Sequence, residues 1–583
     1  MEKRTLLAFA LSAAVMVIWS VFFAPQPPPP RQSAPAEQAA RTPESAAAPQ
    51  AQAAQAIDTG QLPAPAAAVQ APAVVGAAAV EEFRVTTATQ DIRFTNEGGR
   101  IRWWKLLKYS NHEGVAQDLI PKEAAASGEL PFQVVLPADA EGTRRLATAL
   151  HAHELVEIPT GDPSGLGPGT RVEMSWADGK GLAVRKSMVI PSDGYVSQIS
   201  FEVTRDGKPI EATLLTATGL AQKIEGDTQS YGHVEGQGVL HDGREIIRMA
   251  PASLAGPVLY SAARGTPVRW AGLESTYFAS LVLPDGGAPG SDLAISWEPR
   301  RAAAGAAPAA PIIASGVTAP GGTWRLFVGP KDYKLLVGLG HEMERVIDFS
   351  RFSLIYLVTK YLFLALTWIH GSIGNYGWSI IVMTVLLRLV FFPLTYKSAI
   401  TMRQTSKKMA KIQPRVKAIQ ERYKKLGRKT MDQQRQMNEE VMALYKKEGV
   451  NPMANLGGCL PLLLQMPIFI GFYNLLAVTI ELRQAPFILW LGDLSQRDPY
   501  YITPILMGIS WLVQQWMTSA SIPDPMQRRM MMFMPVMFTF FMMNMPSGLV
   551  IYWLTNNILG LVQQWLTNRK ADQLDEAARA LAA

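Results

Sequence analysis

Residues Ser379–Pro393 read SIIVMTVLLRLVFFP, an apolar run that is interrupted only by Thr384 and Arg388. A charged side chain near the middle of a bilayer costs several kcal/mol, about 3 on insertion scales, so an arginine in such a run marks a functional position by default. The usual partner is a carboxylate, but the candidate membrane-spanning stretches of this chain contain no Asp or Glu. The counter-charge must therefore come from water, lipid phosphate or a visiting substrate.

Arg388 is too deep in this run to reach the membrane surface with its own side chain. The next cytoplasmic charge, Lys397, is nine residues further on, which is roughly 13 Å along a helix, whereas the side chain reaches about 6 Å. Water must therefore approach the arginine. Thr384 lies one turn earlier on the same face of this span. Together with neutral polar side chains of other spans, it is a candidate to line a wet groove around the arginine, or alternatively to hydrogen-bond between helices. Those other side chains are Gln465, Thr555, Asn556 and Asn557.

Five apolar stretches, including the one around Arg388, approach about 20 residues, the length that spans a bilayer. They predict spans at 377–396, 457–479, 500–518, 528–545 and 549–567. A sixth run, Thr5–Ala24, follows Lys3 and Arg4. A cleaved signal peptide is the alternative for residues 1–24, but the run is long and lacks a small residue two positions before its end. We therefore expect an uncleaved signal anchor with a cytoplasmic N-terminus.

Charge is concentrated in one loop. The net charge of the chain is +7, yet the segment 397–455 alone carries 15 Lys/Arg and 5 Asp/Glu, so the rest of the chain is net negative. This localisation argues against a general nucleic-acid binder. Positive charge favours the cytoplasmic side, which requires segment 341–372 to lie in the interface as an amphipathic helix rather than to span. The prediction is six spans with both termini in the cytoplasm and one large outside domain.

The segments between the first two spans differ sharply in composition. Residues 25–80 are rich in Ala, Pro and Gln and predict a disordered linker. Residues 81–340 alternate apolar and polar side chains, as at Ile199, Phe201 and Val203 before the turn Asp206–Gly207. Such short strands with Gly and Asp turns predict an all-β sandwich. The low-complexity patch 301–311 is expected to be a surface loop.

The basic loop itself predicts a helical hairpin, residues 399–448. Apolar residues recur at three- and four-residue spacing before Gly427 and again after it. Its charges are either a solvated face that sets the topology or a contact surface for anionic lipid or a ribosome. The candidate contact residues are Lys407, Lys408, Lys411, Arg415, Lys424 and Lys425.

Several other features favour binding over catalysis. Nine methionines lie between Met526 and Met545, and they suit either ordinary packing or a surface that accepts many apolar partners. The single cysteine, Cys459, is expected to be a small buried hydrophobe. We find no phosphate-binding loop, no Gly-x-Ser-x-Gly and no zinc-protease motif. We therefore expect a non-enzymatic protein with neither cofactor nor bound metal.

Six stretches of the C-terminal third are long and distinctive. They begin at Gly374 (GNYGWSIIVMTVLLRLVFFPLT), Asn451 (NPMANLGGCLPLLLQMPIF), Glu481 (ELRQAPF), Asp498 (DPYYITPILMG), Asp524 (DPMQ) and Met545 (MPSGLVIYW). The chain resembles the YidC family of bacterial membrane protein insertases, which also includes Oxa-type and Alb-type insertases. Its long domain after the first span, with Asn96–Gly99, resembles the Gram-negative branch, whose periplasmic domain is a β-supersandwich.

The resemblance implies a mechanism. The intramembrane arginine, here Arg388, would attract the polar or acidic N-terminal part of a substrate into a hydrophilic groove that is open to cytoplasm and lipid. The substrate's apolar helix would then slide along the third and fifth spans into lipid. The matching groove or slide positions are Thr384, Gln465, Met466, Phe469, Tyr552 and Trp553. Trp553 departs from the tyrosine usual there, so no hydroxyl role follows at that position.

The resemblance also implies partners and location. The chain is expected in the bacterial inner membrane, where it inserts, folds and assembles membrane proteins alone or with the Sec translocon. Nascent membrane proteins, Sec components, anionic lipids, the ribosome and the signal-recognition receptor are the candidate partners. The tail 571–583 is short and mixed in charge, so ribosome contact would depend on the hairpin. The alternatives are a pure assembly factor of the translocon and an anion-binding solute carrier.

Overall fold

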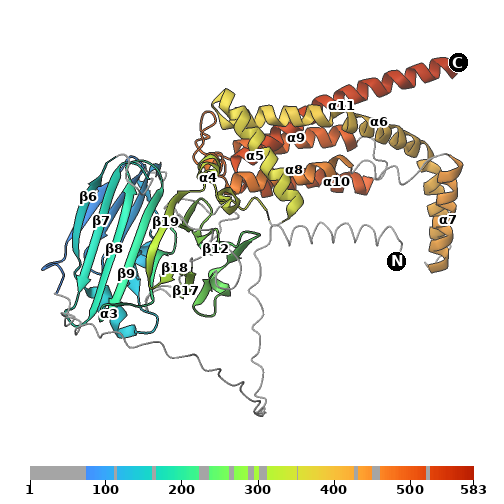
Figure 1. Ribbon diagram of the computed structural model, residues 1–583. Coiled ribbons are helices and arrows are strands. Elements are labelled where there is room, and N and C mark those ends of the chain that lie inside the picture. Colours follow the sequence, from blue (N-terminus) through green and yellow to red (C-terminus); the bar gives the residue numbers. More distant parts are fainter. Residues whose placement is uncertain are drawn as a thin grey trace, which may run out of the picture. The chain divides into compact units, whose positions relative to one another are not determined.

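The computed structural model describes part of the chain. The described residues are 74–110, 114–159, 166–221, 236–261, 268–285, 294–300, 312–350, 352–425, 431–448, 460–519 and 525–582. The predicted signal anchor, nearly all of the predicted linker, the 301–311 loop and Cys459 lie outside these ranges. Strands occupy residues 82–330, and helices dominate from residue 333 onward (Figure 1).

The described strands of the β domain form three antiparallel sheets. A small sheet consists of β1 (Glu82–Thr86), β2 (Gln90–Thr95), β3 (Arg100–Ser110) and β4 (Ala116–Asp118) in that order. The largest sheet contains β6 (Ala152–Ile158), β7 (Gly169–Ala177), β8 (Leu182–Pro191), β9 (Val196–Arg205), β10 (Lys208–Pro209), β12 (Gln237–His241), β13 (Ile246–Met249), β15 (Trp270–Glu274), β16 (Phe278–Pro284) and β19 (Gly321–Pro330). Its order is β13–β12–β15–β16–β19–β9–β8–β7–β6, with β10 paired to β9.

The third sheet packs on the largest one. Its strands are β14 (Val258–Ser261), β17 (Ala294–Arg300), β18 (Ile312–Ala319), β11 (Ala212–Thr218) and β5 (Val134–Val135), in that order. Trp297 of β17 is fully buried, and its indole N–H donates a 2.9 Å hydrogen bond to the carbonyl of Gly272 in β15. The large aromatic ring therefore ties one sheet to the other. The predicted all-β sandwich is confirmed.

Turn chemistry sets the register of the hairpin between β9 and β10. Ile199, Phe201 and Val203 of β9 all point into the core, as their period of two predicted. The strand then reverses at Asp206 and Gly207, which both have positive φ (53° and 74°). Two successive left-handed residues match the twist of a tight hairpin, and Gly adopts that conformation without a Cβ clash. Short helices α2 (Lys122–Ser127), α3 (Ala140–Thr148) and η1 (Pro251–Ser253) complete the domain.

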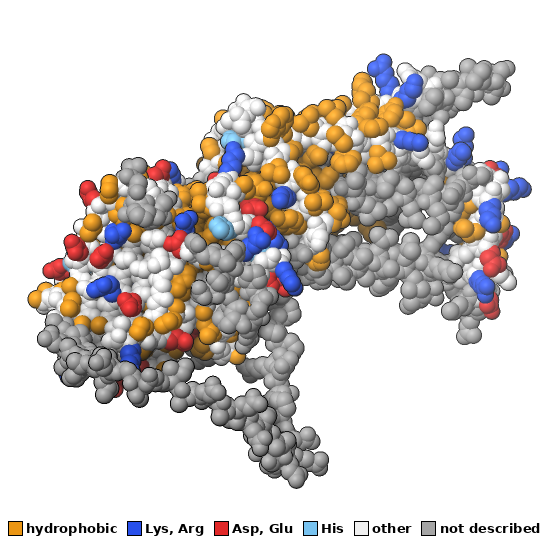
Figure 2. Space-filling view, viewed as in Figure 1, with side chains coloured by type: hydrophobic (Ala, Val, Ile, Leu, Met, Phe, Trp, Pro, Cys, Tyr) orange, Lys and Arg blue, Asp and Glu red, His pale blue; other side chains and the backbone are white. Residues whose placement is uncertain are grey.

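A helical connector follows the sandwich. It comprises α4 (Tyr333–Leu339), η3 (Met343–Val346) and α5 (Ser353–Ile373). Among the described residues, two helical segments are long and apolar enough to cross a membrane, Ser353–Ile373 and Tyr376–Thr401. By length and composition α5 therefore qualifies as a span, and its interfacial placement stays a prediction that depends on the charge distribution. Figure 2 shows hydrophobic side chains gathered over the part of the helical region next to the β domain, and charged side chains over the β domain and over the region of α7.

The predicted spans correspond to helices, with two differences at their ends. The helices are α6 (Tyr376–Lys425), α7 (Met431–Lys447), α8 (Leu460–Val478), α9 (Ile502–Ser519), α10 (Pro525–Met542) and α11 (Ser547–Ala582), with η5 (Ile480–Leu482) after α8. The span predicted to end at 396 continues without a break into the first arm of the hairpin. The predicted tail 571–583 is helical through Ala582. Lys, Arg, Gln, Met and Ala are good helix formers, so both helices continue across the change from apolar to charged sequence.

The predicted helical hairpin is formed by the end of α6 and by α7. Ile412 and Val416 pack against Val441 and Tyr445, and all four side chains are buried. Ion pairs join the arms at Arg415–Glu448 (2.6 Å) and Arg422–Glu440. Arg415 is thus engaged within the hairpin rather than held free for a partner. The side chain of Lys407 lies outside the described set, whereas those of Lys408, Lys411, Lys424 and Lys425 are exposed.

Candidate functional site

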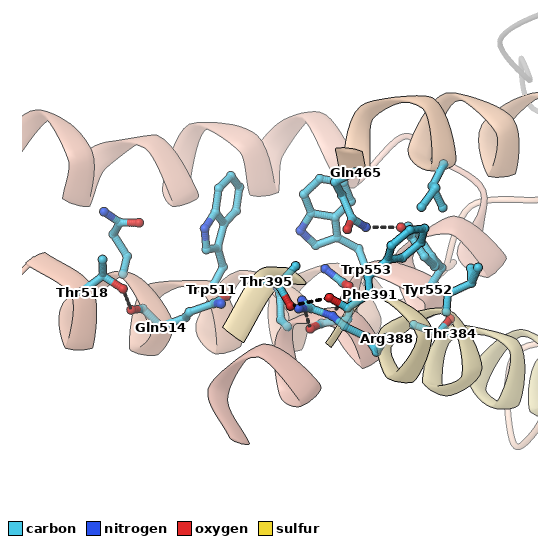
Figure 3. A pocket seen from close by; sticks show the side chains of 15 residues that line it. Thr384, Arg388, Phe391, Thr395, Gln465, Trp511, Gln514, Thr518, Tyr552 and Trp553 are labelled. Carbon is cyan, nitrogen blue, oxygen red and sulfur yellow. Dashed lines mark hydrogen bonds between the residues drawn. The ribbon is translucent and has the colours of Figure 1, made fainter. Parts of the chain in front are cut away.

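A groove lies among helices α6, α8, α9 and α11, and its volume is about 350 Å³. Figure 3 shows Arg388 and Thr384 entering it from α6 and Tyr552 and Trp553 from α11. Its lining mixes amides, hydroxyls, aromatic rings and one guanidinium. The lining residues are Thr384, Leu387, Arg388, Phe391, Thr395, Gln465, Ile468, Trp511, Gln514, Gln515, Thr518, Tyr552, Trp553, Asn556 and Asn557.

The guanidinium of Arg388 is held by neutral groups of α11. Its Nε donates to Oδ1 of Asn556 at 2.8 Å, and its Nη2 donates to the backbone carbonyl of the same residue at 2.9 Å. Nη1 donates to Oε1 of Gln563 at 3.2 Å. All the hydrogen bonds that this side chain makes within the described residues thus go to amide oxygens. A guanidinium carries five N–H groups, so part of its capacity remains for an incoming acceptor.

A glycine allows α6 and α9 to approach α11 at this level. A Cβ placed on Gly560 would lie 2.6 Å from Nε2 of Gln514 and 3.3 Å from Nη2 of Arg388. Both distances are shorter than ordinary van der Waals contact. The missing side chain therefore makes the space in which the glutamine amide of α9 and the guanidinium of α6 both lie against the same turn of α11.

One wall of the groove is aromatic. Tyr552 is buried, stacks on Phe472 with ring centres 4.3 Å apart, and accepts a hydrogen bond from the amide of Gln465. Trp553 packs edge-to-face on Phe469 at 4.9 Å and lies 6.1 Å from the ring of Trp511. Packed rings have few alternative rotamers, so this wall fixes the position of the polar groups beside it.

The predicted groove residues fall into two groups. Arg388, Thr384, Gln465, Tyr552, Trp553, Asn556 and Asn557 all line the groove. The lining does not include Met466, Phe469 or Thr555. Phe469 is buried behind Trp553, while Met466 and Thr555 are half-buried. The hydroxyl of Thr384 donates to the carbonyl of Ile380 at 2.6 Å, so its proton is used within its own helix.

Sequence reasoning missed several polar residues of this site. Gln563 contacts Arg388 directly, and Gln514, Gln515 and Thr518 line the groove from α9. The signal was present, because Trp511, Gln514 and Thr518 follow helical spacing, as do Asn556 and Gln563. Each pattern was short, and nothing local indicated that these two faces meet.

The chemistry of the groove suits reversible binding. Its donors and acceptors are amides and hydroxyls, and its cation is a guanidinium, which pairs well with carboxylates. Within the described part of the chain, no group of three or more His, Cys, Asp or Glu side chains is placed to hold a metal ion. The arrangement can bind a polar or anionic chain segment and release it again.

Comparison with known proteins covers both halves of the chain. The family described as "60Kd inner membrane protein" matches residues 368–574, and "YidC periplasmic domain" matches residues 82–365. The membrane protein insertase YidC of Geobacter metallireducens is 32% identical and aligns over 96% of each chain. That of Citrifermentans bemidjiense is 34% identical over 96% of this chain and 97% of its own. A solved structure of an active YidC insertase aligns over 86% of this chain and 95% of its own, at 17% identity and a TM-score of 0.35.

Proposed function

The chain belongs to the YidC family of membrane protein insertases, a family of inner-membrane proteins with a periplasmic domain, and we propose that it inserts and helps to fold membrane proteins through the groove at Arg388. The observation that carries this proposal is a half-buried cation whose contacts are neutral amides. A substrate that brings a carboxylate supplies the missing counter-charge. The binding is transient because the same carboxylate leaves with the substrate.

The polar part of a substrate would enter first. Moving a polar N-terminal segment through intact hydrocarbon is prohibitive, because every unsatisfied backbone group costs several kcal/mol. A groove with amides, hydroxyls and a guanidinium replaces part of that lost hydration. No nucleotide is required in this scheme, since burial of an apolar helix in lipid drives release and the membrane potential pulls an acidic segment outward.

The apolar part of the substrate would then slide over α8 and α10. The exposed face of α10 carries Met530, Phe533, Met534, Met537 and Phe540. Methionine is flexible and polarizable, so such a face adapts to helices of many sequences. This property fits a protein that handles varied clients rather than a single ligand.

The proposed membrane topology and the proposed partners of the hairpin follow from the distribution of basic residues. Both termini and the α6–α7 hairpin are placed in the cytoplasm, and the β sandwich in the periplasm, because basic residues favour the inner side. The exposed lysines of the hairpin, Lys408 and Lys411 among them, would contact anionic lipid, the ribosome or the signal-recognition receptor. Cooperation with the Sec translocon is part of the same proposal, and the insertion step itself involves no covalent chemistry.

Reconstitution tests the proposal. The purified protein in liposomes is given a short single-span substrate, and the fraction that becomes protected from external protease is measured. Insertion well above protein-free liposomes supports an autonomous insertase. No insertion without other components leaves only an assembly role for the Sec translocon, and flux of small anions without insertion indicates a solute carrier.

A further inference from the structure

We infer that Gln563 of α11 is a positioning residue for the groove. Its neutral amide holds the guanidinium of Arg388 in one orientation and leaves the positive charge of the arginine unpaired, so that a substrate carboxylate can bind it. Gln563 does not line the groove, and sequence patterns did not single it out. The inference deepens the proposed function and rests on it. Gln563 would thus contribute to specificity, by favouring substrates with acidic tails over substrates with neutral tails.

Gln563 is the middle member of a chain of hydrogen bonds. Its Oε1 accepts from Nη1 of Arg388 at 3.2 Å, and its Nε2 donates to Oγ1 of Thr395 at 2.9 Å. The hydroxyl of Thr395 donates in turn to the carbonyls of Phe391 at 3.0 Å and Phe392 at 3.2 Å. The chain of bonds begins at the arginine of α6, crosses to α11 and returns to α6.

The direction of this chain is fixed at both ends. A backbone carbonyl can only accept, so the single hydroxyl proton of Thr395 is committed to α6 and its oxygen must accept from Gln563. A guanidinium can only donate, so the other end of the amide must present its oxygen to Arg388. The flipped amide would place N–H groups against a cation and a carbonyl oxygen against a lone pair. The amide of Gln563 therefore has one favourable orientation.

The neutrality of this partner matters for function. An amide oxygen orients the arginine without cancelling its charge, whereas a carboxylate at the same atom would form a permanent ion pair. Such a pair would satisfy Arg388 in the empty groove, and a substrate carboxylate would have to displace it. Gln563→Glu should therefore imitate a bound acidic tail.

The experiment uses the full chain in liposomes and two single-span substrates that differ only by one Asp or Asn in the N-terminal tail. Gln563→Glu is compared with Gln564→Glu, the same change one residue further along α11 at a half-buried side chain that is not a partner of Arg388. We expect Gln563→Glu to lower insertion of the Asp substrate about tenfold, the effect of one partly screened charge pair, and the Asn substrate less than about twofold. Gln564→Glu should leave the ratio of the two substrates unchanged.

A third variant separates positioning from folding. Thr395→Val removes the acceptor that orients Gln563, so it should reduce the Asp-to-Asn ratio in the same direction but less. An Asp-to-Asn ratio in Gln563→Glu that equals the wild-type ratio, whether or not both substrates lose insertion, would overturn the inference. If the wild-type protein inserts neither substrate, it is the proposed function that fails, because the ratio then has no basis.

Discussion

Arg388 and Asn556 form a two-point contact across helices α6 and α11. Nε of the arginine donates to the side-chain oxygen of Asn556 at 2.8 Å, and Nη2 donates to its backbone carbonyl at 2.9 Å. Two parallel bonds to one residue fix the plane of the guanidinium. The charge is thereby oriented but not neutralised.

Replacing Arg388 should separate charge from geometry. Arg388→Lys keeps the charge but loses the planar fork, so insertion of a substrate with an acidic tail should fall by less than about threefold. Arg388→Ala removes the charge and should lower the same insertion by about tenfold or more. Protease protection in reconstituted liposomes measures both. Equal activity of the alanine variant and the wild type on acidic-tailed substrates would remove Arg388 from the mechanism.

Gly560 provides a test of groove shape at constant charge. Gly560→Ala places a methyl group 2.6 Å from Nε2 of Gln514 and 3.3 Å from Nη2 of Arg388, so both side chains must shift. We expect insertion of acidic-tailed substrates to fall several-fold. Alanine gains about 1 kcal/mol in helix propensity, so thermal stability should not fall in parallel.

The matched control for this change is Gly371→Ala in α5. A Cβ at Gly371 meets nothing within 4 Å, so this variant should insert as well as the wild type. If both alanine variants lose insertion equally, the loss cannot be attributed to the groove.

The buried carboxyl of Glu481 should make the stability of the protein depend on pH. Burial raises the pKa of its carboxyl from 4.5 to about 7, although the backbone N–H of Tyr333 donates to Oε1 at 3.0 Å. Oε2 is buried and has no partner among the described residues. The folded state therefore holds a proton that the unfolded state releases. The contribution of this carboxyl to the free energy of unfolding should be largest below about pH 4.5. It should fall by about 3 kcal/mol as the pH rises to about 7.

The measurement is the thermal unfolding temperature of the detergent-solubilised protein between pH 5 and pH 8. The wild type should unfold at lower temperature as the pH increases through this window. Glu481→Gln cannot ionise and should show a flatter curve. Parallel curves for the two proteins would mean that Glu481 does not titrate in this range.

The hairpin predicts a local effect on protease resistance. Val441 is buried between the arms, whereas the neighbouring Met442 is 40% exposed. Val441→Asp places a charge in a small apolar core and should open the hairpin, since burying an unpaired charge costs several kcal/mol. Limited proteolysis should then cut within 399–448 much faster than in the wild type. Met442→Asp is the control, and equally rapid cutting in both variants would contradict this role of the core.

Local patterns predicted much of the fold. The period of two at Ile199, Phe201 and Val203 identified a half-buried strand, and the Asp206–Gly207 pair identified its turn. The apolar runs identified the helices, because helix formation and hydropathy are properties of neighbouring residues. The helix ends differed from the prediction. Both α6 and α11 continue beyond the predicted spans, since charged residues end an apolar run without ending a helix.

The candidate site, like the fold, could be predicted only in part from the sequence. The sequence by itself determined that Arg388 lies within an apolar helix and that no carboxylate in the spans is available to pair with it. Only the tertiary structure decided which neutral groups hold it. Gln563 is 175 residues away, and its contact with Arg388 depends on which faces of α6 and α11 meet and on how closely Gly560 lets the helices approach. Both depend on packing among side chains of several helices that are far apart in the sequence, so no local pattern encodes them.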